Sequence, residues 1–371
     1  MNNKRSIYIT TNVTCNLNCM YCYEKDKSNH TTFDVNKAIQ TIESVLNVKS
    51  DDNVYINFHG GEPFLVFDKI RTVCEYIWKR SYPTKYIFFT TSNDTLVKGE
   101  IKEWLYQNRH KFVVGLSLDG TKQMHDINRS DSFDKIDIPF FLDTWPDQGI
   151  KMTISPLTIR HLSEGVIFLH DIGIKAINVN LAEMIDWSDE KLLIYYKDEL
   201  HKLALYYKTH PTIQRCSLFR INFANLNKSN IEKWCGAGTS MAVADIDGRT
   251  YPCHLFFESV CGKEKSEAAR NFDFTDISKL VSKDCKECCL LPLCPTCLGS
   301  NYIARGNIAA RDMHLCKYTK IRIAEVAWLE YSLIIDDSIN IAQLTDSEKY
   351  KKLKTLEGIE KILPFLNHQI E

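Results

Sequence analysis

The chain has 371 residues, enough for a large core and more than one folded unit, and its 46 basic and 47 acidic residues leave a formal charge of −1. Balanced charge of this kind gives no electrostatic footprint for nucleic acid or for an anionic membrane surface. No apolar stretch reaches the roughly 18 residues of a membrane-spanning helix, and the N-terminus lacks the apolar core of a signal peptide. We therefore expect a cytoplasmic protein that binds neither nucleic acid nor membrane.

The first half of the chain alternates β-rich runs with amphipathic helices. Six strands are expected, at residues 6–11, 53–59, 85–90, 112–117, 151–155 and 176–181. Apolar residues at helical spacing predict helices between them, for example at 35–46 and 66–80. Repeated strand–helix units favour a parallel sheet with right-handed crossovers. Six units are too few for a closed eight-stranded barrel, so we expect an α/β fold, a partial (β/α)6 TIM-like barrel with its chemistry at the C-terminal ends of the strands.

The second half changes in texture. A helix at about 189–209 leads away from the barrel, and from Cys235 to about residue 317 the chain is rich in cysteine, glycine and proline. Such a stretch buries little apolar surface, so we expect its fold to depend on metal. The expected domains are the barrel with its linking helix at 1–215, a small cysteine-rich domain at 216–330 and a C-terminal helical tail at 331–371.

Fourteen cysteines need an explanation. In a reducing cytoplasm dense cysteine indicates metal binding or catalysis rather than disulfides. Cys74 and Cys216 stand alone and are expected to pack as small buried hydrophobes. The others gather in two groups, one close to the N-terminus and one beyond residue 234.

The first group is Cys15, Cys19 and Cys22, with the spacing CxxxCxxC directly after the first expected strand. Three close thiolates can hold three irons of a 4Fe–4S cluster and leave the fourth iron open to a small molecule. The alternative is a zinc site completed by His30, although zinc sites usually use paired CxxC knuckles.

This motif, with an aromatic residue before its last cysteine, resembles the signature of the radical S-adenosylmethionine (SAM) superfamily. The segment 59–63, His-Gly-Gly-Glu-Pro, resembles the family's GGEP motif, which contacts the methionine amino group of SAM, and glycine there lets the backbone approach a ligand closely. The segment 115–129 resembles an S-x-D-G…H…R stretch near the SAM ribose and carboxylate. The resemblance implies that SAM is bound by Tyr21, Gly60, Gly61, Glu62, Ser117 and Arg129. For Arg129 a surface salt bridge is an equal alternative.

The second group is ordered as well. The order of its cysteines resembles the SPASM domain of radical SAM peptide and protein maturases, which carries two auxiliary 4Fe–4S clusters. The resemblance implies auxiliary cluster II on Cys285, Cys288, Cys294 and Cys316, and auxiliary cluster I on Cys235, Cys253 and Cys297. With the first cluster this gives three 4Fe–4S clusters. The alternative is a pair of zinc knuckles, but only five residues separate them, against the 15–20 typical of zinc ribbons.

Two departures from the SPASM pattern bear on the ligands. Two residues, rather than three, separate Cys294 from Cys297. Met241 stands where anaerobic sulfatase maturases supply a further cysteine. Cluster I therefore has either an open iron or a substitute ligand, for which Cys261 on a flexible-looking loop is a better candidate than Cys289.

The resemblance also implies a reaction. One electron from the first cluster cleaves SAM, and the resulting 5′-deoxyadenosyl radical takes hydrogen from an unactivated carbon. Relatives with this pair of domains act on peptides or proteins, so the expected partners are a precursor peptide and an electron donor such as flavodoxin or ferredoxin. Because the first motif begins at Cys15, we expect no N-terminal leader-recognition domain, and a separate leader-binding protein is an option.

The residue after Cys253 separates two kinds of maturase. Sulfatase maturases carry a catalytic aspartate there, whereas this chain has His254, which can be a base at neutral pH or a packed residue. We expect an enzyme that cross-links a ribosomally synthesised peptide oxidatively, through a C–C cyclophane or a thioether. An anaerobic sulfatase-maturating enzyme that forms formylglycine, and a non-catalytic, zinc-stabilised binding module, are the alternatives.

Overall fold

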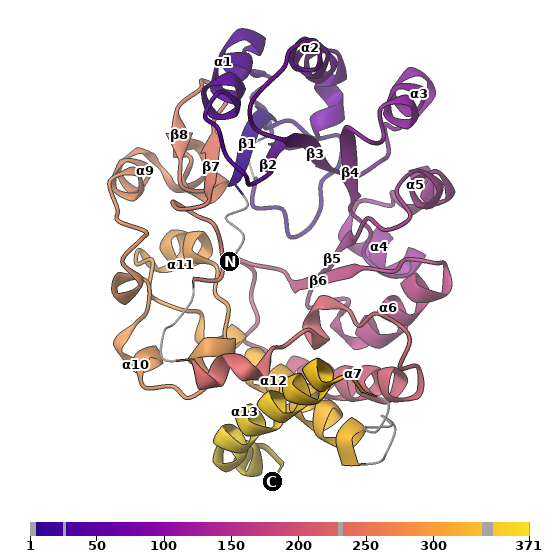
Figure 1. The fold of residues 1–371 in the computed structure, drawn as a ribbon, viewed down its shortest axis with the longest axis vertical. Coiled ribbons are helices and arrows are strands. Elements are labelled where there is room, and N and C mark those ends of the chain that lie inside the picture. Colours follow the sequence, from indigo (N-terminus) through magenta and orange to yellow (C-terminus); the bar gives the residue numbers. More distant parts are fainter. Residues whose placement is uncertain (1–4, 25–26, 229–232, 336–343, 371) are drawn as a thin grey trace. The chain divides into compact units, whose positions relative to one another are not determined.

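The computed structural model describes residues 5–24, 27–228, 233–335 and 344–370 (Figure 1). The chain forms two compact units, one made of residues 1–152 and 235–276 and the other of 153–234 and 277–371. The cysteine-rich segment therefore contributes to both units, and this division cuts across the expected domain at 216–330. Residues 1–4, which belong to the N-terminus that we expect to lack a signal peptide, lie outside the described part.

The first unit is built on a six-stranded sheet with the order β4-β3-β2-β1-β7-β8. Its strands are β1 (Arg5–Asn12), β2 (Val54–Gly60), β3 (Tyr86–Ser92), β4 (Phe112–Leu116), β7 (Met241–Ala244) and β8 (Thr250–Tyr251). Strands β1 to β4 are parallel, so their carboxyl ends share one edge. This edge carries the loops that follow β1, β2, β3 and β4, where all three N-terminal motifs lie.

Apolar side chains explain the strands and the helices on the outer face of the sheet. Ile56, Phe58 and Phe88 are fully or almost fully buried. Helices α1 (Val35–Leu46), α2 (Phe67–Trp78) and α3 (Gly99–Gln107) lie along the outside of β1 to β4 (Figure 1). Each buries one face, and Asp34 caps α1 by accepting from the Lys37 N–H.

Helices α4 (Lys122–Asn128) and α5 (Ile138–Thr144) follow β4. A parallel bridge between Ser117 and Lys151 continues the strand edge toward β5 (Ile150–Ile154), which pairs with β6 (Ile177–Leu181) in a separate two-stranded sheet. All six expected strands are present, and the α/β class with a parallel sheet is confirmed.

The expectation that the cysteine-rich segment buries little apolar surface is wrong for its first part. Strand β7 pairs in parallel with β1, from Ser6↔Met241 to Ile9↔Ala244, and β8 returns antiparallel to it. Val243, Tyr251 and Phe257 form a small buried cluster of their own. Two short helices follow, α8 (Glu258–Cys261) and α9 (Lys263–Arg270).

The second unit is mainly helical. It contains α6 (Leu162–Asp171), α7 (Lys191–Thr209), α10 (Lys283–Lys286), α11 (Leu298–Arg305), α12 (Met313–Ile335) and α13 (Asp346–Ile370). Helix α12 packs along α7, and α13 packs on the short 3-10 turn Phe223–Asn227. Gly358 permits this contact because a Cβ there would collide with the Phe223 backbone.

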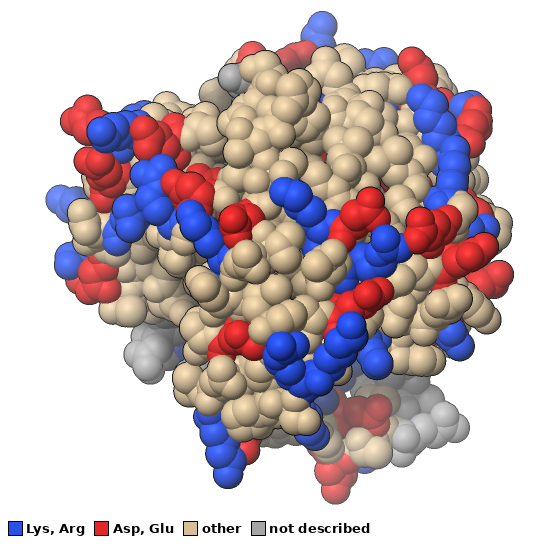
Figure 2. Space-filling model, turned by 90° about the horizontal axis from the view of Figure 1, so that it is seen from above, with Lys and Arg blue, Asp and Glu red and all other residues tan. Residues whose placement is uncertain are grey.

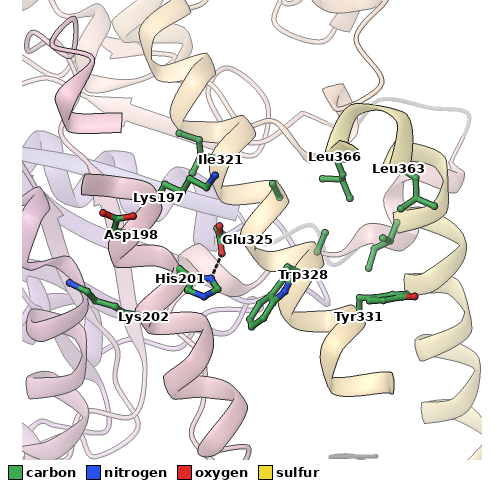
Figure 3. Close-up of a pocket in the computed structure, with 13 residues that line it drawn as sticks. Lys197, Asp198, His201, Lys202, Ile321, Glu325, Trp328, Tyr331, Leu363 and Leu366 are labelled. Carbon is green, nitrogen blue, oxygen red and sulfur yellow. Dashed lines mark hydrogen bonds and ion pairs between the residues drawn. The ribbon is translucent and has the colours of Figure 1, made fainter. Parts of the chain in front are cut away.

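A cavity of about 930 Å³ opens among α7, α12 and α13 (Figure 3). Ala324 and Ala327 line it together with the larger Trp328. His201 Nδ1 and Glu325 Oε2 are hydrogen-bonded over 3.1 Å across its wall. None of the residues that the sequence singled out lines this cavity.

The distribution of charged side chains and the hydropathy of the helices agree with the expectations from the sequence. The face seen in Figure 2 shows basic and acidic side chains interspersed rather than gathered by sign. Within the described residues, no helix is both long enough and apolar enough to cross a bilayer.

Candidate active site

The three N-terminal cysteines lie on the loop that leaves the carboxyl end of β1. The Leu17 N–H donates to Cys15 Sγ over 3.4 Å, and Lys27 Nζ donates to the Leu17 carbonyl over 2.7 Å. The Cys22 N–H closes a turn on the Cys19 carbonyl. We call residues 15–22 the cluster loop.

The thiols of the cluster loop face one another. Burial raises the pKa of Cys15 and of Cys19, and the neighbouring thiols raise both further, so each lies within electrostatic reach of the others. Arg129 opposes this at Cys19 and favours its thiolate. Half-buried thiols with an N–H donor and a nearby cation are a donor set that suits an anionic iron–sulfur cluster.

The end of β3 holds one side of the cluster loop. Asn93 donates to the Asn16 side chain over 2.9 Å and also points at Cys15 Sγ over 3.9 Å. Asn16 in turn donates to Thr95 Oγ1 over 2.7 Å. Sequence reasoning missed Asn93, and the signal that could have found it is its position immediately after a parallel strand.

The end of β4 holds the other side through a buried carboxylate. Asp119 is fully buried, and its Oδ2 accepts from Tyr21 at 2.6 Å, Arg129 Nε at 2.9 Å and Asn128 at 3.2 Å. Asn128 also accepts the Met20 N–H through its carbonyl. Asp119 thus ties the aromatic residue of the cysteine motif to the S-x-D-G…H…R segment.

The position of Arg129 in this network decides against the alternative of a surface salt bridge. Its side chain is 10% exposed, and Asp119 offsets the cost of burial, so the pKa of Arg129 is raised overall. A surface salt bridge is therefore wrong. Its guanidinium lies 5.4 Å from the Tyr21 ring centre, close to the cluster loop.

Glu62 of the GGEP motif is held rigidly. Its carboxylate accepts from the Phe64 N–H, the Asn93 N–H and the Ser92 hydroxyl at 2.8–3.1 Å. Burial raises the pKa of Glu62, and these donors act in the opposite direction. These three donors fix the position of the Glu62 carboxyl group, from which it can meet a cationic ligand group.

The structure explains why the two residues before Glu62 are glycines, which the sequence alone did not. A Cβ on Gly60 would collide with Asn12, and one on Gly61 would collide with the Thr14 backbone. The N–H groups of Gly61 and Glu62 donate to the carbonyls of Asn12 and Thr14 at 3.0 and 2.9 Å. Glycine is needed here because the GGEP loop lies directly on the start of the cluster loop.

Ser117 lies at the end of β4 and is almost buried, with its N–H donating to the Ser92 carbonyl. Next to it along the edge is Lys151, a residue that sequence reasoning also missed. Burial and then Arg129 lower the pKa of Lys151, yet its side chain remains accessible. Lys151 thus places a cation at the same strand edge as Ser117, where it can meet an anionic ligand group.

His254 lies in a group of rings. Its ring centre is 4.9 Å from that of Tyr23 and 4.6 Å from that of His59, and Tyr23 is hydrogen-bonded to His59 over 2.8 Å. Burial and then Lys151 lower the pKa of His254 to about 4, so the imidazole is neutral at pH 7.

The four cysteines assigned to auxiliary cluster II come together within the second unit. Cys285, Cys288, Cys294 and Cys316 stand on α10, on the turns after it and in the first turn of α12. Burial raises the pKa of Cys294 to about 11, and the other three thiols act on it in the same direction. Their mutual proximity fits one shared cluster.

The remaining cysteines are divided between the units. Cys235 and Cys253 belong to the first unit and Cys297 to the second. Cys261 ends α8, so the expectation of a loop is wrong for it, and Cys289 is exposed. Cys74 and Cys216 are fully buried, as expected.

The spacing of these side chains bears on the zinc alternative. Among the described residues, no three His, Cys, Asp or Glu side chains converge tightly enough to hold one metal ion. Zinc needs its sulfurs at about 2.3 Å and hence close together. In a cubane each thiolate binds its own iron, so a wider spacing suits a 4Fe–4S cluster.

Comparison with known proteins gives this site a family. Residues 9–137 match the model of the Radical SAM superfamily. The chain is 25% identical over 315 residues to a cysteine-type anaerobic sulfatase-maturating enzyme of Clostridium perfringens, covering 76% of this chain and 84% of that protein.

Solved structures share the fold. Native anSMEcpe with bound AdoMet superposes with a TM-score of 0.69 at 20% identity, covering 90% of this chain and 99% of that one. Streptococcus suis SuiB bound to its precursor peptide SuiA gives a TM-score of 0.55 at 18% identity, covering 85% and 76%. Residues 9–137 therefore form a radical SAM domain, and the chain is an enzyme of the radical SAM type, whose chemistry uses SAM and a 4Fe–4S cluster.

Proposed function

We propose that this protein is a maturase that removes a hydrogen atom from a ribosomally synthesised peptide and completes an oxidation that cross-links it, as a C–C cyclophane or a thioether. The observation that carries the proposal is the residue beside Cys253. His254 is a neutral imidazole among aromatic rings, where the sulfatase maturases have a carboxylate. SuiB, which shares the fold, is bound to a precursor peptide, and this supports the same substrate class.

In this proposal the residues of the cluster loop region bind and orient SAM. The thiolates of Cys15, Cys19 and Cys22 hold the first cluster, which with SAM supplies a 5′-deoxyadenosyl radical when both are bound. Gly60, Gly61 and Glu62 meet the methionine amino group. The hydroxyl of Ser117 meets the ribose.

Arg129 takes the SAM carboxylate, and its partner Asp119 sets its position. The guanidinium Nε is already occupied by Asp119, which leaves the two terminal nitrogens to point elsewhere. Tyr21, anchored on the same carboxylate, closes the cluster loop against Arg129. Rigid placement of this kind keeps a reactive radical away from competing partners.

The auxiliary clusters belong to the proposal as well. Cluster II would use Cys285, Cys288, Cys294 and Cys316, and cluster I would use Cys235, Cys253 and Cys297. The partners would be a precursor peptide, an electron donor such as flavodoxin or ferredoxin, and optionally a separate leader-binding protein.

Cluster I would keep an open iron, since Met241 occupies the expected fourth position. A Cys261→Ala variant examined by Mössbauer spectroscopy tests this. An unchanged cluster I supports the open iron, and loss of cluster I shows that Cys261 is the fourth ligand.

The test of substrate class offers two peptides to the anaerobic enzyme with dithionite and SAM. One is the product of a short reading frame beside the gene, and the other is a sulfatase peptide with the target cysteine or serine. We expect the first to lose about two hydrogens in mass, since abstraction plus one further electron is a net oxidation. Formylglycine in the sulfatase peptide, with the short peptide unchanged, would show that the sulfatase-maturating function is the correct one.

The similarity to the Clostridium perfringens enzyme makes sulfatase maturation the second candidate. Within the first candidate function, peptide cross-linking, a His254→Ala variant separates two roles of His254. A variant that abstracts hydrogen but stalls before product supports a proton-accepting role for His254, whereas full turnover shows that the ring only packs. Iron and sulfide analysis after anaerobic purification excludes or establishes the zinc-stabilised binding module.

A further inference from the structure

The second unit contains a guanidinium without a carboxylate partner. Arg311, just before α12, donates from Nη1 to the Cys294 carbonyl over 3.4 Å and from Nη2 to Thr319 Oγ1 over 3.1 Å. Its Nε is buried and has no hydrogen-bond partner among the described residues. Within the same part of the chain, no Asp or Glu lies within ion-pair distance of Arg311.

Among the described residues, the neighbouring acids do not form an ion pair with Arg311. Asp312 forms its ion pair with Arg305 over 3.2 Å. Glu183 accepts a hydrogen bond from Ser300 and lies within electrostatic reach of Arg305 and Arg311, which lower its pKa, but burial is the larger effect and raises the pKa of Glu183 overall. A partly buried, unpaired arginine is costly unless a negative charge faces it.

The thiolates assigned to cluster II are the negative charge close to Arg311. Arg311 is bonded to the backbone of Cys294 and lies within electrostatic reach of its thiol. A 4Fe–4S cluster with four thiolates carries a net charge of about −2 when oxidised and about −3 when reduced. The orphaned Nε and the unpaired charge of Arg311 thus fit a bound cluster.

We propose that Arg311 is the counter-charge of auxiliary cluster II and raises its reduction potential, so that this cluster accepts electrons. The inference rests on the proposed function, because it requires a cluster on Cys285, Cys288, Cys294 and Cys316. Reduction adds one electron to the cluster, from dithionite in the test below and, in turnover, from the substrate radical left by hydrogen abstraction, which is thereby oxidised. A fixed positive charge stabilises the reduced form more than the oxidised form, since the reduced form carries one more negative charge.

The chain offers matched controls. Arg311→Gln removes the charge, and Arg311→Lys keeps the charge but loses the fork that reaches both partners. Lys317→Gln removes the same charge one residue beyond Cys316, but Lys317 is exposed and paired with Glu190 at 2.9 Å, so solvent screens it.

The experiment is an EPR-monitored redox titration of the full chain, in which Cys15, Cys19 and Cys22 are replaced by Ala to remove the first cluster. About eight irons should remain for two clusters. We expect Arg311→Gln to lower the reduced-to-oxidised ratio of one cluster about tenfold at a fixed potential, equal to ~59 mV for one electron. Arg311→Lys should keep most of the potential, and Lys317→Gln should leave it within about twofold.

The outcomes distinguish failure of the role proposed for Arg311 from failure of the proposed function. A full iron content with an unchanged midpoint in Arg311→Gln overturns the role of Arg311 and leaves the proposed function intact. Loss of about four irons from Arg311→Gln but not from Arg311→Lys supports the counter-charge, because both variants lose the fork and the lysine variant keeps the charge. If the background protein binds no iron, the auxiliary clusters of the proposed function are wrong and the inference fails with them.

Discussion

The two cysteine regions of this chain are organised by different means. The cluster loop is held by side chains from the ends of two strands, through Asn93 after β3 and Asp119 after β4. Around Cys285, Cys288 and Cys294 the backbone hydrogen bonds join residues only three or four apart, and Arg311 adds one long-range bond to the Cys294 carbonyl. We therefore expect the sheet to pre-organise the first region, and the second region to obtain much of its order from its cluster.

The largest expected effect comes from the cluster loop itself. Replacing Cys15, Cys19 and Cys22 by Ala should abolish reductive cleavage of SAM and remove about four of 12 irons. Because Asn93 and Asp119 hold the loop without metal, circular dichroism should show an unchanged fold. Cleavage that survives the triple change, or zinc in place of iron, would contradict the site.

Iron removal should separate the two regions. After anaerobic chelation, amide hydrogen exchange at residues 283–298 should accelerate about tenfold or more, because local turns alone give little protection. Exchange in the cluster loop should change by less than about threefold. Equal acceleration in both regions would show that the sheet does not pre-organise the cluster loop.

A third prediction concerns Asp119. Asp119→Asn keeps the shape but removes the charge that holds Arg129 and Tyr21, so SAM affinity should fall about 10- to 100-fold, as for other residues that orient ligands. Equilibrium dialysis of SAM with the reconstituted protein measures this. Asp134→Asn is the control, since Asp134 is exposed and pairs with Lys122 in a 2.6 Å salt bridge, and this variant should bind SAM normally.

The smallest effect concerns Asp94 at the end of β3. Burial and then Glu62 raise the pKa of Asp94 to about 8. The folded state therefore keeps a proton that the unfolded chain loses above pH ~4, so this contribution to stability is present below that pH and is lost as pH rises toward 8. Urea unfolding at pH 8 should find Asp94→Asn more stable than the wild type by at least ~1.4 kcal/mol, the equivalent of one pKa unit.

A matched control is available for this measurement. Asp94 and Asp131 both have positive φ values, 62° and 48°, which asparagine also tolerates. Asp131 is exposed, so Asp131→Asn should not change the pH dependence. A wild type whose stability does not fall between pH 5 and 8 would show that Asp94 is ionised in the folded state.

The sequence predicted the elements better than their long-range contacts. Runs of β-branched and aromatic residues located all six strands within two residues, because period and composition are local properties. The pairing of β7 with β1 could not be predicted, since Met241–Ala244 is too short to show a period and its partner is far away in sequence.

The site divides in the same way. Motif spacing found the cysteines, Glu62 and Arg129, which belong to recognisable patterns. Asn93 and Lys151 were missed because each acts through its place at the strand edge, which only the folded sheet defines. Gly60 and Gly61 were found in the same way, but their close contact with Asn12 and Thr14 is a property of the folded chain that the sequence does not show.

The most direct test of the account follows one hydrogen atom. A precursor peptide deuterated at the attacked side-chain carbon is incubated anaerobically with the reconstituted enzyme, SAM and dithionite, and the 5′-deoxyadenosine is analysed by mass spectrometry. We predict deuterium in 5′-deoxyadenosine together with a cross-linked peptide lighter by about two hydrogens, because the closed site leaves the radical few other partners. Unlabelled 5′-deoxyadenosine beside an unchanged peptide would contradict the account.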